Sequence, residues 1–147
     1  MIPVLRALSK KYPNVEFNLA SRPKMAPLFE EFVNINFIPL DLDNDYKGLN
    51  GIYKLFKILK LTKPTHIADL HFVIRTRIIG LLFKILGYRV KSIDKGRKQK
   101  KALTRIKNKH FEPLTPTIFR YSKVFSKLGF SIDFTKNELP HNNSLPE

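Results

Sequence analysis

Asp69 and His71 are the clearest pair of side chains that could do chemistry. They lie two residues apart at the end of the predicted strand 65–71, a spacing that places two side chains on the same face of a strand. Such a pair could line a polar cleft. The alternative is structural: a buried carboxylate orients the neighbouring turn, with His71 as its partner. The sequence leaves both interpretations open.

Arg75 and Arg77 stand at the start of the next predicted helix, 75–86. The amino end of a helix favours anions, and a guanidinium group binds phosphate through two hydrogen bonds. A phosphate-binding role is one interpretation of this pair. The other interpretation is that both arginines are solvated on an exposed turn.

The strongest charge feature is the basic segment 95–110, which follows the predicted strand 88–93. Most charge runs are solvated faces. Here the whole chain is basic, with 27 Lys and Arg against 12 Asp and Glu and a net charge of +15. Such a balance favours an anionic surface or ligand as partner. The candidate anion contacts in this segment are Lys95, Arg97, Lys98, Lys100 and Lys101.

Several other kinds of site are not indicated. The chain has no cysteine, which excludes disulfides and thiolate metal sites. His66 and His71 lack the spacing and carboxylate neighbours of a metal site, and no P-loop, GxGxxG, GxSxG or HExxH pattern occurs. The phenylalanines follow core periodicity and do not interleave with the basic segment, unlike a base-stacking platform. We therefore expect no metal and no cofactor.

The elements that must position these residues alternate along the chain. Strands are predicted at 15–20, 36–40, 65–71 and 88–93, and helices at 2–12, 21–32, 49–63, 75–86 and 118–128. This alternation predicts an α/β fold with a Rossmann-like, mostly parallel sheet and flanking helices. Ligands then bind beyond the carboxyl ends of the strands, which adds Ser21 and Arg22 to Asp69 and His71 as cleft-lining candidates.

The two ends of the chain carry further expectations. The pattern opens with a helix, whereas an α/β unit normally opens with a strand, so we expect the first strand of the sheet to be missing. From Thr135 the composition becomes polar and proline-containing. The predicted organisation is therefore a partial domain, 1–134, followed by a linker or tail, 135–147.

Several motifs together resemble the amino-terminal domain of glycosyltransferase family 9, the heptosyltransferases of lipopolysaccharide core assembly. The similarity runs from about residue 3 to residue 130, and the order and spacing of the motifs carry it. They are Pro3-Val4-Leu5-Arg6-Ala7-Leu8, Tyr12-Pro13, Ser21-Arg22-Pro23, Asp69-Leu70-His71, Arg75-Thr76-Arg77, Asp94-Lys95-Gly96-Arg97 and Lys100-Lys101-Ala102-Leu103-Thr104.

The resemblance implies half of an inverting transferase of the GT-B fold. The amino-terminal domain of that family binds a lipid-linked sugar acceptor, and a carboxy-terminal domain binds ADP-heptose. The chemistry requires no metal. A general-base aspartate follows the family's first strand in a Gly-Asp turn, which would lie upstream of Met1, and the donor domain would begin after about residue 140. The resemblance therefore assigns no catalytic residue to this chain, and the chain alone is expected to be inactive.

The implied partners are a lipopolysaccharide precursor and the anionic inner-membrane surface, with ADP-heptose only through the donor domain. The implied location is cytoplasmic and peripheral at the inner membrane. Two other functions stay open. One is a basic nucleic-acid-binding module, supported only by charge, and the other is a non-catalytic remnant that binds anionic surfaces.

Overall fold

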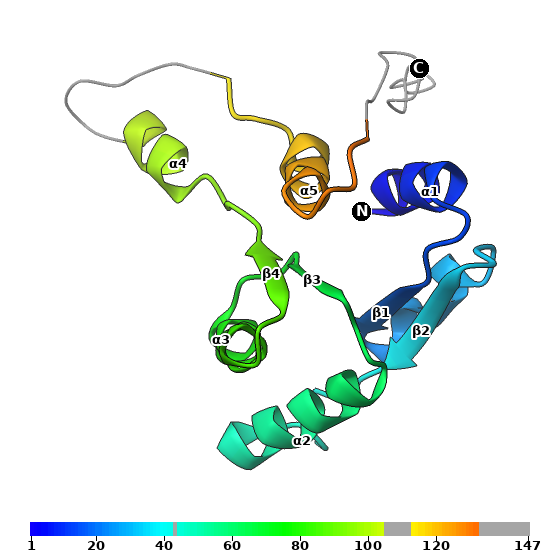
Figure 1. The fold of residues 1–147 in the computed structure, drawn as a ribbon. Coiled ribbons are helices and arrows are strands. Elements are labelled where there is room, and N and C mark those ends of the chain that lie inside the picture. The colour runs from blue at the N-terminus through cyan, green and yellow to red at the C-terminus, as the bar shows by residue number, and fades with distance from the viewer. Residues whose placement is uncertain (43, 105–112, 133–147) are drawn as a thin grey trace, which may run out of the picture.

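The protein is a mixed α/β structure in which short parallel strands lie between helices (Figure 1). The computed structural model describes residues 1–42, 44–104 and 113–132. Its elements are α1 (Ile2–Lys11), β1 (Phe17–Ser21), the 3₁₀ helix η1 (Pro23–Phe29), β2 (Ile35–Pro39), α2 (Gly48–Leu61), β3 (His66–Asp69), α3 (Ile74–Ile85), β4 (Arg89–Ser92), α4 (Arg97–Leu103) and α5 (Thr117–Ser126).

The helices begin and end where their local sequence dictates. Pro3 occupies the first turn of α1, where its missing N–H group costs nothing. Gly87 ends α3 with a φ of +86°, a left-handed conformation that glycine adopts without strain. Its N–H group donates to the carbonyl of Lys84. Gly87 therefore ends α3 two residues before β4 begins at Arg89.

The strands form two separate pairs, β1 with β2 and β3 with β4, and both pairs are parallel. All four strands run in the same general direction. The ring of Phe130 contacts Tyr12, which precedes β1, and His66, which opens β3. At the other end, Arg75 after β3 donates to the carbonyl of Leu42 after β2. The carboxyl ends of all four strands therefore meet at one edge, called here the carboxyl edge.

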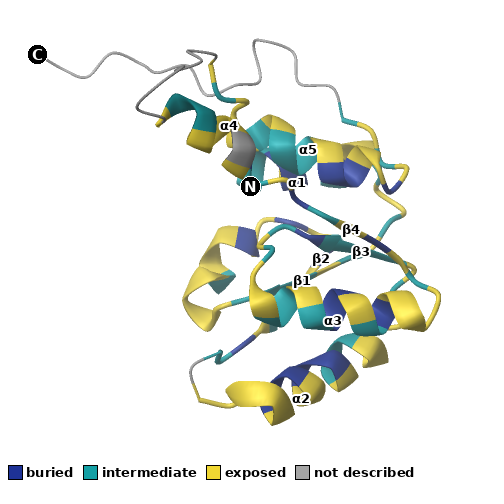
Figure 2. Ribbon diagram, turned by 90° about the vertical axis from the view of Figure 1, so that its left-hand side faces the viewer, coloured by how far each residue is buried: buried dark blue, intermediate teal, exposed yellow. Residues whose placement is uncertain are grey.

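Helices cover both faces of the strands (Figure 2). On one face α1 and α5 pack in a cluster that contains Val4, Leu8 and Phe125. On the other face α2 and α3 pack in a cluster that contains Phe56 and Phe83. Both clusters include residues from both strand pairs. The two strand pairs therefore belong to one layer of a three-layer arrangement.

The positions of the predicted strands and of most helices are confirmed, with four differences. The structure has one helix that the sequence did not predict, α4 in the basic segment. The single predicted sheet is two strand pairs. The predicted helix 21–32 is the short helix η1, because Pro27 inside it cannot donate a helical hydrogen bond, and Met25 and Leu28 are exposed instead of packed. The predicted strand 65–71 ends at Asp69.

Two sequence predictions fall partly or wholly outside the described residues. These are the linker 135–147 and the last part of the basic segment, 105–110. Within the described ranges, no helix combines the length and apolar character needed to cross a membrane.

Candidate anion-binding site

The carboxyl edge gathers the turns that contain most of the predicted site residues. Ser21 ends β1, the Asp69 turn follows β3, and Asp94 to Gly96 follow β4. Because parallel α/β layers bind ligands beyond this edge, these turns form the candidate site. Basic side chains dominate it, and each turn is held by its own hydrogen bonds.

Asp69 organises the turn after β3. Its side chain is buried, and Oδ1 accepts hydrogen bonds from the backbone N–H groups of His71 and Phe72, at 3.0 and 2.8 Å. Phe72 has a φ of +46°, a costly conformation for a bulky residue that these two bonds help to hold. The other oxygen, Oδ2, is buried and makes no hydrogen bond. Asp69 therefore orients the turn after β3, which is the structural role that the sequence had left open.

His71 does not share a face with Asp69, contrary to the spacing argument. The strand ends at Asp69, so side-chain alternation does not extend to residue 71. The imidazole of His71 is exposed, and only its backbone N–H group meets Asp69. The prediction of a side-by-side pair is therefore wrong, although both residues lie at the carboxyl edge.

Removing the carboxylate of Asp69 tests this role. We expect Asp69→Ala to lower the free energy of unfolding by about 1–3 kcal/mol, because two part-buried backbone N–H groups lose their acceptor. Asp69→Asn keeps an acceptor oxygen and is expected to lose less. Urea unfolding of both variants measures the difference. Equal losses for the two variants would show that the hydrogen bonds to Oδ1 are not what stabilises this turn.

Arg75 and Arg77 both have partners within the protein. The Arg75 guanidinium donates from Nη2 to the carbonyl of Leu42 at 3.2 Å, and the Arg77 guanidinium carbon lies 5.4 Å from the ring centre of Phe72. Arg75 therefore connects the turns after β2 and β3, and Arg77 covers the turn that Asp69 holds. These contacts fix both cations at the amino end of α3. Contacts within the protein therefore hold both arginines, unlike the freely solvated pair that the sequence also allowed.

Arg120 of α5 holds the turn after β4, a role that the sequence did not reveal. Its guanidinium donates to the carbonyls of Thr115 and Asp94 at 2.8 and 3.3 Å and to Oε1 of Gln99 at 3.0 Å. Gly96 lies directly against it: a Cβ atom there would be 1.8 Å from Nη1 of Arg120. Gly96 also has a φ of +61°, and its N–H group donates to Oδ1 of Asp94.

Among the described residues, no salt bridge joins Lys95, Arg97, Lys100 or Lys101 to an acidic side chain. Lys95 is half-buried, and Arg97, Lys100 and Lys101 are exposed. Within the described ranges, the one salt bridge joins Arg6 to Glu31. Both residues lie far from this site along the sequence. The backbone of Lys98 lies in α4, and its side chain is outside the described residues. The site therefore presents several positive charges that have no ion-pair partner among the described residues, on a turn that Arg120 fixes.

Loss of Arg120 is expected to loosen α4. Arg120→Ala removes the two hydrogen bonds, to the carbonyl of Asp94 and to Oε1 of Gln99, that join α4 and its preceding turn to α5, each worth about 0.5–1.5 kcal/mol. We expect trypsin to cleave after Arg97, Lys100 and Lys101 at least about fivefold faster, because local opening controls proteolysis. Lys123→Ala, on the exposed side of α5, is the matched control. If trypsin cleaved Arg120→Ala at the same rate as the control variant, Arg120 would not be what holds α4 in place.

Ser21 and Arg22 complete the carboxyl edge. The carbonyl of Ser21 accepts a hydrogen bond from the N–H group of Leu40, just beyond β2. The carbonyl of Arg22 accepts one from Met25 and starts η1. The Ser21 backbone therefore continues the β1–β2 pairing, and the Arg22 backbone serves the start of η1. The Ser21 side chain is half-buried and that of Arg22 is exposed.

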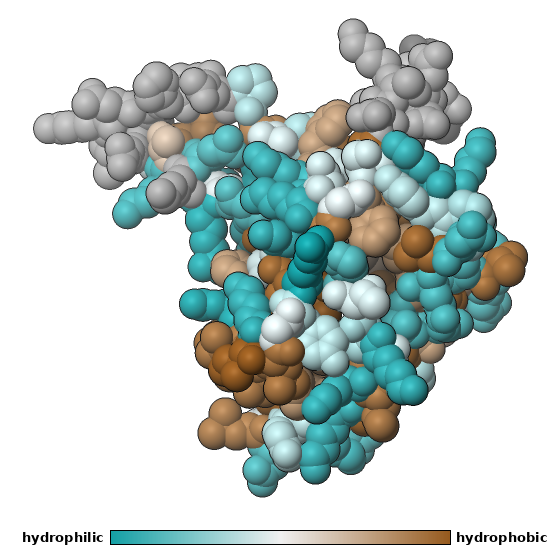
Figure 3. Space-filling view, in the orientation of Figure 1, coloured by the Kyte–Doolittle hydropathy of each residue, from teal (hydrophilic) through white to brown (hydrophobic). Residues whose placement is uncertain are grey.

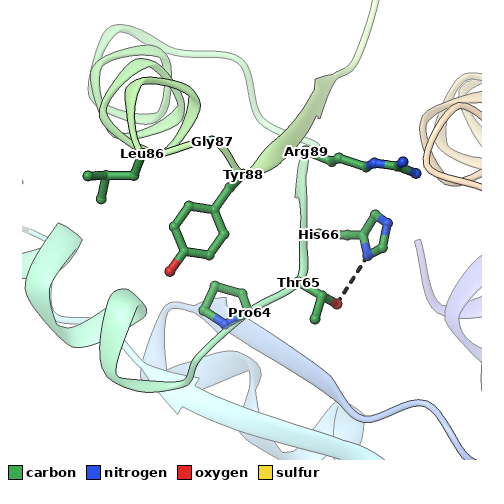
Figure 4. A pocket seen from close by; sticks show the side chains of 7 residues that line it. All are labelled: Pro64, Thr65, His66, Leu86, Gly87, Tyr88 and Arg89. Atoms are coloured by element: carbon green, nitrogen blue, oxygen red, sulfur yellow. Dashed lines mark hydrogen bonds between the residues drawn. The ribbon is translucent and has the colours of Figure 1, made fainter.

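A hollow lies at the opposite edge of the strand layer. It has a volume of about 390 Å³ and is lined by the residues around the starts of β3 and β4 (Figure 4). His66 and Arg89 project from neighbouring strands to one side of it, and His66 Nδ1 lies 3.1 Å from Oγ1 of Thr65. None of the predicted site residues lines this hollow. In the described ranges, no three His, Asp or Glu side chains gather as metal ligands would.

The space-filling view shows an apolar feature over α3. Hydrophobic side chains gather over α3 (Figure 3), where Ile74, Leu81 and Ile85 are exposed. Their spacing along the helix, together with half-buried Ile78, places them on one side of α3. Arg77 and Lys84 are exposed on the same helix.

Comparisons with known proteins add no relative. No family model matches the chain, and searches of curated proteins and of solved structures gave no significant match.

Proposed function

We propose that this chain is the acceptor-side domain of a glycosyltransferase that resembles family 9, and that it binds a phosphorylated, lipid-linked sugar. In the intact enzyme a GT-B partner domain would hold ADP-heptose, and heptose would pass to the lipopolysaccharide inner core. The motifs Asp69-Leu70-His71, Arg75-Thr76-Arg77 and Asp94-Lys95-Gly96-Arg97 support this reading. All three follow strand ends at the carboxyl edge.

The uncompensated cations at the carboxyl edge are the observation on which the proposal rests. Lys95, Arg97, Lys100 and Lys101 have no acidic partner among the described residues. Phosphate groups would supply the missing negative charge, and a guanidinium group can bind two phosphate oxygens at once. Arg75 and Arg77, fixed at the amino end of α3, would face the same ligand edge.

The exposed apolar residues on one side of α3 support a site close to a membrane surface. Ile74, Leu81 and Ile85 are exposed on a helix that also carries Arg77 and Lys84. A helix with an apolar side bordered by cations suits the interface of an anionic bilayer. A lipid-linked acceptor is reached at that interface. The apolar side of α3 and the cations of the carboxyl edge would therefore bind the same substrate.

The test compares one oligosaccharide with and without its phosphates. We expect the protein to bind a phosphorylated inner-core oligosaccharide at least about tenfold more tightly than the same compound after phosphatase treatment. Isothermal titration calorimetry at physiological salt measures both. Duplex DNA of equal total charge is the competitor. Tighter binding to DNA would replace this proposal with the nucleic-acid-binding function, and equal affinity for both oligosaccharides would contradict phosphate recognition.

A further inference from the structure

One side of α3 is apolar although it faces away from the strands. Ile79 and Phe83 are buried in the cluster that α2 and α3 share. Residues 74, 81 and 85 project from the opposite side of the helix. Ile74, Leu81 and Ile85 are 75%, 58% and 72% exposed. Single exposed apolar residues need no explanation, whereas a row of them along one helix marks an interaction surface.

The outward side of α2 belongs to the same surface and is basic. Both helices cover the same face of the strands (Figure 2). Leu55 and Phe56 of α2 are buried in the shared cluster, so the sides of α2 and α3 that lie opposite to the cluster face solvent together. The ammonium group of Lys57 lies 4.7 Å from the ring centre of exposed Tyr53. The exposed cations of α2 are Lys54, Lys57 and Lys60.

Negative charge is almost absent from this part of the chain. From Tyr46 to Ile93 the sequence has ten Lys and Arg and one acidic residue, Asp69. The carboxylate of Asp69 is buried and accepts hydrogen bonds within its own turn. A second copy of the protein would bring the same cations and be repelled. The partner that complements this surface is therefore anionic.

The apolar side of α3 selects a bilayer among anionic partners. Nucleic acid would meet the lysines through its phosphates but would offer nothing apolar to Leu81 and Ile85. An anionic bilayer offers headgroups to the cations and the start of the acyl layer to the apolar side chains. Lysine side chains can lie along apolar neighbours while their charged ends stay in the headgroups. Tyrosine, as at residue 53, is enriched at membrane–water interfaces.

We propose that α2 and α3 lie flat on an anionic bilayer, with the apolar side of α3 inserted among the headgroups and the lysines of α2 against them. Because α3 begins just after the turn that Asp69 holds, its amino end with Arg75 and Arg77 then lies at headgroup level. The carboxyl edge opens sideways along the membrane surface. Docking of this kind goes beyond the proposed function, since it needs lipid alone and no sugar acceptor.

A single fluorophore tests which side of the protein meets the lipid. The chain has no cysteine, so Leu81→Cys and its matched control Leu28→Cys can each carry one polarity-sensitive label. Leu28 is also exposed, but its neighbour Phe29 packs in the cluster on the other face. Phosphatidylcholine vesicles with about one-third phosphatidylglycerol should shift the emission of the label at residue 81 to shorter wavelength, and not that at residue 28. Equal shifts at both positions, or no shift at residue 81, would overturn the proposal.

Sedimentation with the same vesicles measures the apolar contribution. Leu81→Gln combined with Ile85→Gln should weaken binding at least about tenfold, because two apolar side chains no longer leave water. Leu28→Gln combined with Val33→Gln removes two exposed apolar side chains elsewhere and should bind like the unmodified protein. Equal urea midpoints for the two double variants show that folding is not what changed. Equal binding of the two double variants would contradict insertion of α3.

The charged contribution is measured with three lysines on each face. Glutamine at Lys54, Lys57 and Lys60 should weaken vesicle binding roughly 100-fold. Glutamine at three exposed lysines of α1 and α5 should weaken it less than about threefold; these are Lys10, Lys11 and Lys123. Equal losses in the two triple variants would mean that net charge alone attracts the protein, and tight binding to pure phosphatidylcholine would also contradict an anionic partner.

The probes keep this surface separate from the acceptor site. The vesicles contain no sugar and the inner-core oligosaccharide contains no lipid, so vesicle binding without oligosaccharide binding supports the docking and contradicts the proposed function alone. Oligosaccharide binding without vesicle binding overturns the docking alone. If duplex DNA displaced the vesicles and bound the Leu81 and Ile85 double variant as tightly as the unmodified protein, the surface would bind nucleic acid instead. Self-association without vesicles that the same double variant abolishes would mean that a second copy covers α3.

Discussion

Gly51→Ala is expected to cause the largest loss of stability of any single methyl addition to this protein. A Cβ atom at residue 51 would lie 2.2 Å from the carbonyl carbon of Tyr46 and 2.6 Å from its Cα and O atoms. These are backbone atoms, which cannot turn aside as a side chain can. Tyr46 is itself buried in the cluster of α2 and α3. The start of α2 would therefore have to move away from that cluster.

Overpacking of this kind costs about 1–3 kcal/mol and sometimes more. The gain of about 1 kcal/mol from replacing glycine in a helix offsets only part of it. We expect the urea midpoint of Gly51→Ala to fall clearly below that of the unmodified protein. Gly80→Ala is the matched control, because its Cβ atom would meet Val90 Cγ1 at 3.4 Å, and its stability should be equal or higher. Equal midpoints for the two variants would contradict the close approach of Tyr46 to α2.

The largest expected effect on binding comes from three lysines at the carboxyl edge. Replacing Lys95, Lys100 and Lys101 by glutamine removes cations that have no acidic partner among the described residues. Each lysine near an anionic surface contributes ~1 kcal/mol. Since 1.4 kcal/mol is a factor of ten, the triple variant should bind the phosphorylated inner-core oligosaccharide roughly 100-fold more weakly. Calorimetric titration measures the change.

The matched control removes the same charge from the opposite edge. Lys10 lies near the end of α1, and Lys60 and Lys63 lie at the end of α2, where the chain approaches the starts of β1 and β3. All three are exposed. Replacing them by glutamine should weaken binding by less than about threefold, because screening limits their reach to roughly 10 Å. An equal loss in both triple variants would mean that net charge, and not a local site, binds the ligand.

Local patterns in the sequence predicted the elements but not their pairing. Proline and glycine at residues such as Pro3 and Gly87, with apolar periodicity between them, located α1 and α3 to within a residue or two. Which edges stay unpaired depends on contacts between segments far apart in the chain, such as Phe130 with Tyr12 and His66. No local pattern contains that information.

The candidate site was predictable as a location and less so as a set of interactions. The rule that ligands bind beyond strand ends placed Asp69, Lys95 and Arg75 correctly at one edge. It could not show that Asp69 accepts backbone hydrogen bonds, because that depends on where β3 ends. Arg120 gave no signal, since a single arginine on an amphipathic helix is normally solvated. Its partners, Asp94 and Gln99, come together with it only in the fold.

One measurement tests most directly whether the carboxyl edge binds a phosphorylated acceptor. Backbone amide shifts of the labelled protein are followed by NMR while a phosphorylated inner-core oligosaccharide is added. We expect saturable shifts at Arg75, Arg77, Lys95 and Gly96, and none for the phosphatase-treated oligosaccharide. Shifts centred on His66 and Arg89 at the opposite edge, or identical shifts with both oligosaccharides, would contradict it.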